Sequence, residues 1–314
     1  MITILGPTAC GKTTLAVAVA RALDGDIISA DSRQVYRGMD IGTGKDLSEY
    51  AEGGTPVPYH LIDIAEPGTK YNLFEYQRDF HIIYNRLQEQ RRPVVLCGGT
   101  GLYLEAVIKG YALSPVPQND ALREELASRS LAELTEMLKE LKRRNGSVMH
   151  NTTDVDTAQR AIRAIEIEQY NLECPQARRV FPAVSTTIIG LSVDRDERRR
   201  RISQRLDARL SGGMVEEIRS LLDRGIAAED LMYYGLEYKY VTEYVIGKTC
   251  YQEMHDRLEI AIHQFAKRQM TWFRGMERRG LSIHWIDGQQ PLEEKVKTVL
   301  ALANEQHKNC EHER

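Results

Sequence analysis

The chain carries a phosphate-binding pattern close to its first residue. Residues 6–13 read GPTACGKT and match the spacing G-x-x-x-x-G-K-[ST], a loop whose backbone N–H groups surround phosphate oxygens. In such a loop Lys12 reaches the terminal phosphates, and the hydroxyl of Thr13 is a ligand for Mg²⁺. An apolar run before the loop predicts a strand and helical spacing after it predicts a helix, the context that the pattern requires. We therefore expect a phosphate chain to be bound by Gly6, Pro7, Thr8, Ala9, Cys10, Gly11, Lys12 and Thr13.

Asp31 is the second candidate, because it ends the apolar run that follows the first predicted helix. Ligands of parallel sheets collect at the carboxyl ends of the strands, so Asp31 should face the same crevice as the phosphate loop. A carboxylate there could hold Mg²⁺, accept a proton, or only cap the next turn. The polar, glycine-rich segment over residues 32–45 is too long for a tight connection, which favours a functional loop.

The acid that usually holds the metal of an ATPase is absent from its expected place. The apolar run PVVLC, residues 93–97, continues into two glycines and Thr100 instead of an aspartate. This sequence weakens the interpretation as an ATP-hydrolysing enzyme, although it leaves a small-molecule kinase possible.

Basic residues are clustered although the net charge is only −3. Residues 195–209 hold seven arginines among three acids, and helical spacing places Arg198, Arg201 and Arg205 on one face. A second cluster over residues 266–280 has Trp272 and Phe273 between arginines. Such runs are often solvated helix faces, and the aromatic residues are equally typical of core packing. Their combination favours a groove for nucleic acid.

The elements expected around these residues indicate an α/β fold. Apolar runs alternate with helical patterns up to residue 113, which predicts a parallel sheet covered by helices on both faces. Residues 114–183 predict helices over 120–128, 131–144 and 154–169, and a strand pattern resumes at 186–193. We therefore expect a catalytic core of residues 1–113 plus 184–314, with residues 114–183 as a helical insertion.

Other classes of protein are disfavoured by the composition. The five cysteines are far apart and the eight histidines form no H-x-x-x-H pair, which argues against disulfide frameworks and zinc enzymes. The phosphate loop begins too early for a signal peptide, and no apolar run approaches the roughly 20 residues that span a bilayer. We expect a cytoplasmic protein with no membrane partner.

Taken together, the motifs resemble the tRNA dimethylallyltransferases over nearly the whole chain. GPTACGKT, ISADSRQVYRGMDIGTGK, YHLIDI, GGTGLYLEAV, QRAIRAIE and AKRQMTWFR occur in that family's order and spacing. The resemblance implies a P-loop NTPase-like parallel sheet flanked by helices, with an inserted all-helical subdomain that grips the anticodon stem-loop of tRNA. It also implies that the loop binds dimethylallyl diphosphate with Mg²⁺, and that the dimethylallyl group is transferred to N6 of the adenine 3′ of the anticodon with release of pyrophosphate.

The resemblance assigns roles residue by residue. Asp31 matches the general base, and Lys12, Thr13 and Arg205 match groups that act on the diphosphate, with Arg201 as the competing assignment for the arginine. Gly6 to Thr13 match the diphosphate loop, and Thr13 the metal ligand. The positions that match tRNA-binding residues are Asp31, Ser32, Arg33, Gln34, Thr100, Arg123, Gln159, Arg160, Ala161, Ile162, Arg163, Lys267, Arg268, Gln269, Trp272 and Arg274.

The sequence departs from the family pattern in two places and leaves other functions open. Tyr59 and His60 stand where two histidines are common, and GLEYKYVTEY replaces a GYKE-like stretch, so residues 235–244 are not assigned to the site. The alternatives are an adenylate isopentenyltransferase, a small-molecule P-loop kinase, and an RNA-binding switch that senses nucleotides. Nothing in the sequence demands a partner chain, so we expect a monomer.

Overall fold

The computed structural model describes residues 1–146 and 155–312, with side chains through residue 306. The chain divides into two compact units, one formed by Met1–Lys109 with Ala183–Arg314 and the other by Gly110–Pro182. The sequence prediction placed these divisions at residues 113 and 184, a few residues later.

The larger unit is built on a six-stranded sheet with the order β3-β2-β4-β1-β7-β8, and every neighbouring pair is parallel. The parallel sheet predicted from the sequence is confirmed. Its strands are β1 (Ile2–Leu5), β2 (Asp26–Ser29), β3 (Tyr59–His60), β4 (Val94–Gly98), β7 (Thr187–Ser192) and β8 (His284–Asp287).

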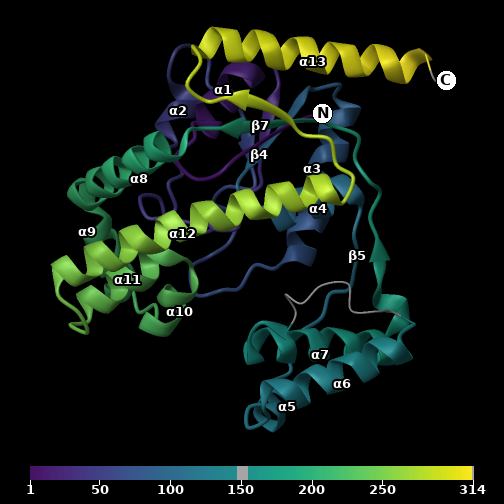
Figure 1. Cartoon of the computed structure of the whole chain (residues 1–314), viewed down its shortest axis with the longest axis vertical. Helices are drawn as coiled ribbons and strands as arrows, with labels where there is room; N and C mark the ends of the chain where they lie inside the picture. The colour runs from purple at the N-terminus through teal and green to yellow at the C-terminus, as the bar shows by residue number, and fades with distance from the viewer. Residues whose placement is uncertain (147–154, 313–314) are drawn as a thin grey trace. The chain divides into compact units, whose positions relative to one another are not determined.

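Helices cover both faces of the sheet (Figure 1), and successive side chains of β1 pack on opposite layers of helices. Ile4 packs with α1 (Lys12–Ala22) and α13 (Leu292–His312). Leu5, the next residue, packs with α3 (Leu73–Glu89), α4 (Gly101–Lys109) and the end of α12 (Tyr251–Arg278). Burial of both faces explains why these strands are continuous apolar runs.

The register brings the loops of the site to one edge of the sheet. Leu5 at the end of β1 pairs with Gly98 at the end of β4. The N–H of Ala30 donates to the carbonyl of Cys97 at 2.7 Å, and the N–H of Thr100 donates to the carbonyl of Ala30 at 3.1 Å. The phosphate loop, Asp31 and Thr100 therefore all follow the carboxyl ends of adjacent strands.

A third apolar cluster joins helices to the long loop after β2. It contains residues of α8 (Arg195–Arg209), the π-helical turn Leu210–Met214, α9 (Val215–Asp223), α10 (Ala228–Tyr233), α11 (Leu236–Val245) and α12. Val35, Tyr36 and Met39 of the loop are fully or almost fully buried in the same cluster. The helices therefore fix the loop that begins at Asp31, and the four-residue α2 (Ser48–Ala51) follows it.

The smaller unit has a core of its own. Helices α5 (Asp120–Leu126), α6 (Leu131–Arg144) and α7 (Ala158–Glu173) pack through Leu126, Leu134, Leu138, Ala161 and Ile165. The prediction of an all-helical insertion is wrong in one respect, because two short strands form an antiparallel pair at the ends of the smaller unit. These strands are β5 (Ala112–Leu113) and β6 (Arg179–Val180). Irregular chain follows β5, and the short 3-10 turn Pro175–Ala177 precedes β6. The third predicted helix begins at Ala158 with Thr157 as its cap, and residue 154, where the prediction began, lies outside the described residues.

Among the described residues, no helix combines the length and apolar character needed to cross a membrane.

Candidate active site

The phosphate loop has the backbone conformation of an anion site. Gly11 caps α1 with a φ of 86°, and Ala9 also has a positive φ. A Cβ on Gly6 would lie 2.7 Å from Sγ of Cys10 and 2.9 Å from the carbonyl of Leu191, so this close approach requires glycine. The loop thus directs the free N–H groups of the α1 N-terminus, and the positive end of its dipole, toward a bound anion.

The ammonium of Lys12 folds back over this loop. Its Nζ donates to the carbonyl of Pro7 at 2.8 Å. Cys97 lies behind the loop, where burial, opposed by the charge of Lys12, raises the pKa of the thiol to about 12. The Cys97 side chain is therefore a neutral thiol at physiological pH.

Gln269 joins the phosphate loop to the neighbouring turn after β4. Its Oε1 accepts from the N–H of Thr8 at 2.8 Å, and its Nε2 donates to the carbonyl of Gly99 at 3.0 Å. A Cβ on Gly99 would lie 2.6 Å from Nε2, so only glycine admits this amide. The side chain is buried, and we therefore correct the expectation that Gln269 contacts RNA directly: its amide is used to hold two loops of the site.

Asp31 and Thr100 lie at the same edge of the sheet as the phosphate loop, after the ends of β2 and β4. Oδ1 of Asp31 accepts from the N–H of Arg33 at 2.9 Å, so the carboxylate does cap its own turn. Within the part of the chain that the structure describes, no group donates a hydrogen bond to Oδ2, the other oxygen of this carboxylate. Oγ1 of Thr100 accepts from the N–H of Ser32 at 3.0 Å. The cap fixes the orientation of the carboxylate, and capping and proton transfer are therefore compatible roles.

The remaining residues predicted for this segment serve different contacts. Gln34 accepts from the hydroxyl of Ser29 at 3.0 Å and donates to the carbonyl of Gly44 at 3.1 Å, so its amide braces the loop. The guanidinium of Arg33 lies 5.6 Å from the ring centre of Tyr233, which is half exposed. Both side chains are partly exposed, but the amide of Gln34 is used within the loop whereas the guanidinium of Arg33 packs on Tyr233.

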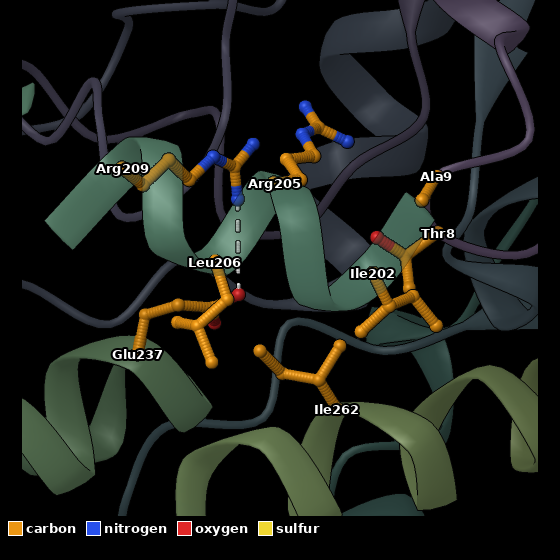
Figure 2. Close-up of a pocket in the computed structure, with 8 residues that line it drawn as sticks. All are labelled: Thr8, Ala9, Ile202, Arg205, Leu206, Arg209, Glu237 and Ile262. Atoms are coloured by element: carbon orange, nitrogen blue, oxygen red, sulfur yellow. Dashed lines mark ion pairs between the residues drawn. The ribbon is translucent and has the colours of Figure 1, made fainter. Parts of the chain in front are cut away.

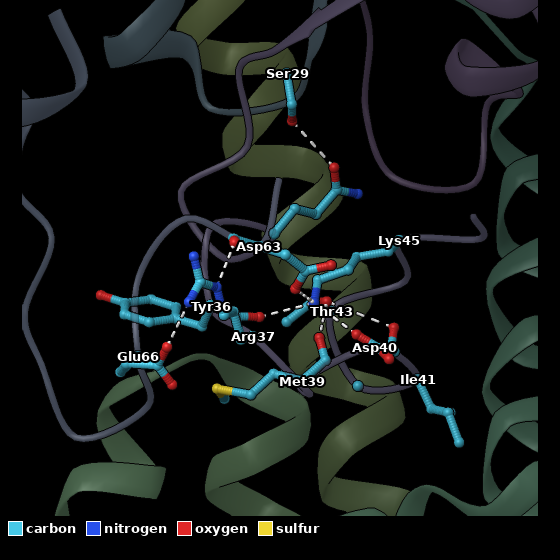
Figure 3. A network of polar contacts seen from close by, with 12 residues as sticks. Ser29, Tyr36, Arg37, Met39, Asp40, Ile41, Thr43, Lys45, Asp63 and Glu66 are labelled. Atoms are coloured by element: carbon cyan, nitrogen blue, oxygen red, sulfur yellow. Dashed lines mark hydrogen bonds and ion pairs between the residues drawn. The ribbon is translucent and has the colours of Figure 1, made fainter. Parts of the chain in front are cut away.

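A buried lysine fixes the loop over residues 31–45 (Figure 3). Nζ of Lys45 donates to the carbonyl of Tyr36 at 2.7 Å and to the carboxylate of Asp40 at 2.6 Å, and it also pairs with Asp63. The Lys45 side chain is fully buried. A buried ammonium with three oxygen partners is strongly constrained, and Lys45 thereby ties two points of this loop to Asp63.

Glu217 of α9 holds the same loop from the other side. Its carboxylate accepts from the N–H groups of Asp40 and Ile41, both at 2.8 Å, and of Gly42 at 3.1 Å. The hydroxyl of Tyr238 donates to it at 2.6 Å, and burial together with the Glu217 charge raises the pKa of Tyr238. The sequence analysis missed both residues. Tyr238 lies in the stretch that departs from the family pattern, and no spacing rule links Glu217 to a loop 175 residues away.

Arg205 lies in a pocket beside the phosphate loop (Figure 2). It forms an ion pair with Asp46, whereas Arg201 pairs with Glu197 of its own helix at 2.6 Å. Arg205 therefore lines the pocket beside Thr8 and Ala9 of the phosphate loop, and Arg201 does not. Helical spacing had predicted that the two arginines share a face. The lining residues are Thr8, Ala9, Ile202, Arg205, Leu206, Arg209, Glu237 and Ile262. Sequence reasoning missed Arg209 and Glu237, although Arg209 is one helical turn from Arg205.

The end of α12 presents basic side chains to solvent. Lys267, Arg268 and Arg274 are exposed. Trp272 is only partly exposed and packs on Gly101, where a Cβ would overlap its indole ring. Its ring is therefore part of the packing between α12 and α4, which was the alternative interpretation of this residue, and the contact of Trp272 with tRNA stays a prediction.

In the smaller unit, the predicted tRNA-binding residues lie on α5 and α7. Glu166 accepts from Nε of Arg123 at 2.7 Å and from Arg163 at 3.0 Å. Burial raises the pKa of Glu166, but these bonds and that from the N–H of Asn119 outweigh it and lower the pKa overall. Gln159 and Arg160 are exposed and Ile162 is partly exposed. The Ala161 side chain is fully buried in the core, so Ala161 is corrected to a packing residue.

The donors at the phosphate loop suit a metal ion that is bound through its substrate. Among the described residues, no group of three or more His, Cys, Asp or Glu side chains is arranged to hold a metal. Thr13 is in the first turn of α1, and the next residue, Thr14, donates to Glu49 at 2.8 Å. A hydroxyl in this first turn would serve a Mg²⁺ ion that takes most of its ligands from phosphate oxygens and water.

Comparisons with known proteins identify the family of the chain. A sequence profile described as IPP transferase matches residues 34–276, and one described as isopentenyl transferase matches residues 1–61. The chain belongs to the IPP transferase family. The resemblance drawn from the motifs is thereby confirmed.

Relatives of this family member are similar over almost the whole chain. The tRNA dimethylallyltransferase 2 of Bacteroides fragilis is 60% identical over 299 residues, which are 95% of this chain and 96% of the relative. The tRNA dimethylallyltransferase 1 of Parabacteroides distasonis is 58% identical over 98% of each chain.

Solved structures of the family share the fold. The tRNA isopentenylpyrophosphate transferase of Bacillus halodurans is 32% identical and superposes with a TM-score of 0.71 over 99% of this chain and 98% of the other. A eukaryotic dimethylallyltransferase acting on tRNA has a TM-score of 0.72 over 92% of this chain and 73% of its own, at 19% identity, which supports the fold alone.

Proposed function

We propose that this protein transfers a dimethylallyl group from dimethylallyl diphosphate to N6 of the adenine 3′ of the anticodon in tRNA, releasing pyrophosphate. The observation that carries the proposal is the meeting of the phosphate loop with Asp31 and Thr100 at one edge of the sheet, tied together through Gln269. A leaving diphosphate and a base that accepts a proton are the two groups that such a transfer needs. The family membership and the names of the relatives support the same reaction.

The leaving group is the main target of the phosphate loop. As the bond from the first prenyl carbon to the diphosphate oxygen breaks, negative charge develops on the diphosphate. The N–H groups of the loop, the ammonium of Lys12 and the guanidinium of Arg205 stabilise that charge. Mg²⁺, held by the Thr13 hydroxyl and the phosphates, would supply further positive charge.

The acceptor amine needs a base because its lone pair is delocalised into the adenine ring. N6 forms the new bond to the first prenyl carbon and loses one proton, which Asp31 accepts. The hydrogen bond from the N–H of Arg33 orients the carboxylate for this transfer. To reach the site, the adenine leaves its stack in the anticodon loop at a cost of a few kcal/mol. Contacts from Lys267, Arg268, Arg274 and the insertion to the RNA backbone offset that cost.

Mass spectrometry of tRNA nucleosides tests the proposal. We expect dimethylallyl-adenosine after incubation of tRNA with the protein, dimethylallyl diphosphate and Mg²⁺. Asp31→Asn should lower the rate by about 10²- to 10⁴-fold while the affinity for tRNA is kept. Prenylation of free AMP but not of tRNA would instead indicate an adenylate isopentenyltransferase, and ATP turnover without prenyl transfer would indicate a kinase. An Asp31→Asn protein with unchanged rate would refute the role of the base.

We propose that the enzyme acts as a monomer in the cytoplasm, which light scattering and cell fractionation would check.

A further inference from the structure

Arg209 is a largely buried cation next to the phosphate loop, and the reaction described above gives it no role. It lies one turn after Arg205 on α8, and its side chain is 15% exposed. A Cβ on Gly44 would overlap Nη2 of Arg209 and lie 2.8 Å from Nη2 of Arg205. Both guanidinium groups therefore reach the same glycine of the loop that begins at Asp31, and both line the pocket beside Thr8 and Ala9.

The carboxylates near Arg209 compensate its charge poorly. Asp46 and Glu237 each lie 3.9 Å from its guanidinium nitrogens, the outer limit of an ion pair, and Asp46 also pairs closely with Arg205 (Figure 2 draws the pair with Glu237). Burial, and next the neighbouring charge of Arg205, lower the pKa of Arg209. A buried guanidinium is stable when its N–H groups bond to an anion in good geometry. An anionic ligand in this pocket would supply that geometry.

We propose that Arg209 is a second arginine of the diphosphate site, acting with Arg205, and that Asp46 competes with the diphosphate for both. This inference rests on the proposed function. The forked guanidinium of Arg209 binds phosphate oxygens from the α8 wall of the pocket, and Glu237 orients it before the ligand arrives. Asp46 already forms ion pairs with both arginines. The diphosphate must therefore replace this carboxylate in part of those ion pairs when it binds.

Calorimetric titration of the full chain with inorganic pyrophosphate and Mg²⁺ tests the inference. We expect Arg209→Met to weaken binding about 10- to 100-fold, the loss typical of a charged hydrogen bond. Asp46→Asn should have the opposite effect and tighten binding, a result that a merely structural Asp46 would not give. The matched control is Arg200→Met on the same helix, since Arg200 is 59% exposed and pairs with Glu197.

The outcomes separate this inference from the proposed function. Wild-type protein that neither binds pyrophosphate nor prenylates tRNA would overturn the proposed function. Wild-type protein that does both, with Arg209→Met binding pyrophosphate as tightly as Arg200→Met, would overturn the role of Arg209 alone. If Arg209→Met does not fold, as judged by thermal melting, Asp46→Asn decides: tighter binding of pyrophosphate supports the inference, and unchanged or weaker binding refutes it. The Kd for an anticodon stem-loop RNA should be unchanged in all these variants.

Discussion

Replacement of Gln269 by methionine should loosen the phosphate loop without touching any group that reacts. Methionine has a similar length and shape, but it supplies neither the acceptor for the N–H of Thr8 nor the donor for the carbonyl of Gly99. The change therefore removes two hydrogen bonds while it nearly conserves packed volume.

The magnitude follows from the burial of the two partners. A buried polar group that loses its partner costs about 1–3 kcal/mol. The bond to Gly99 is buried, so its loss belongs near the upper end, whereas Thr8 is partly exposed and water can replace part of its bond. The sum is about 2–4 kcal/mol, which corresponds to a fall in melting temperature of roughly 4–8 °C for a unit of this size.

Scanning fluorimetry and steady-state kinetics test this expectation together. The melting temperature should fall, and the KM for dimethylallyl diphosphate should rise because the loop N–H groups are no longer held in place. Gln264→Met is the matched control, since Gln264 is an exposed glutamine on the same helix. A Gln269→Met protein with the melting temperature and KM of the Gln264→Met control would refute the assignment of Gln269 as a positioning residue.

Three further changes test other parts of the structure. Glu217→Gln leaves one amide oxygen for three N–H groups and a hydroxyl; hydrogen exchange at residues 40–42 should accelerate, by about 1–3 kcal/mol of lost protection, and unchanged protection would contradict the bracing role. The bond to Asp207 raises the pKa of His255 above 6.5, so its stabilisation is complete below that pH and is lost as pH rises through the folded-state pKa. Wild type should therefore lose more stability than His255→Gln between about pH 6 and 8 in urea titrations, and parallel curves would argue against it. The pKa of Glu166 is lowered, so its pH dependence has the opposite sign: its stabilisation is present above pH 4.5 and is lost as pH falls through the folded-state pKa. Glu166→Gln should therefore make the acid unfolding of the helices, followed by circular dichroism, less steep. An unchanged profile would count against the pair with Arg123.

Local rules were enough to predict the sheet and the positions of the phosphate loop and Asp31 at its edge. The phosphate loop follows from its own spacing, and Asp31 follows from the rule that ligands meet at the carboxyl ends of parallel strands. Both rules depend on neighbours in sequence or on a topology that the alternation of strands and helices already implies.

The residues that were misassigned or missed depend on how helices are rotated in the packed structure. Arg201 and Arg205 look equivalent on a helical wheel, but burial of Ile202 and Leu206 turns Arg205 toward the phosphate loop and leaves Arg201 to Glu197. Gln269 is buried, as is Phe273 one turn later, so it faces inward although it stands between basic residues. A basic run in the sequence records which residues are charged and does not record which side of the helix is covered.

The two chain segments that lead to and from the insertion leave the larger unit next to each other. The N–H of Val184, after the insertion, donates to the carbonyl of Val107, before it, at 3.3 Å. Both residues belong to the larger unit. A short turn between these segments would complete the larger unit without any change in its strand order. Because the entropic cost of closing a loop rises by only about 0.6 kcal/mol for each doubling of its length, the length of the insertion has little effect on the closure of the catalytic sheet.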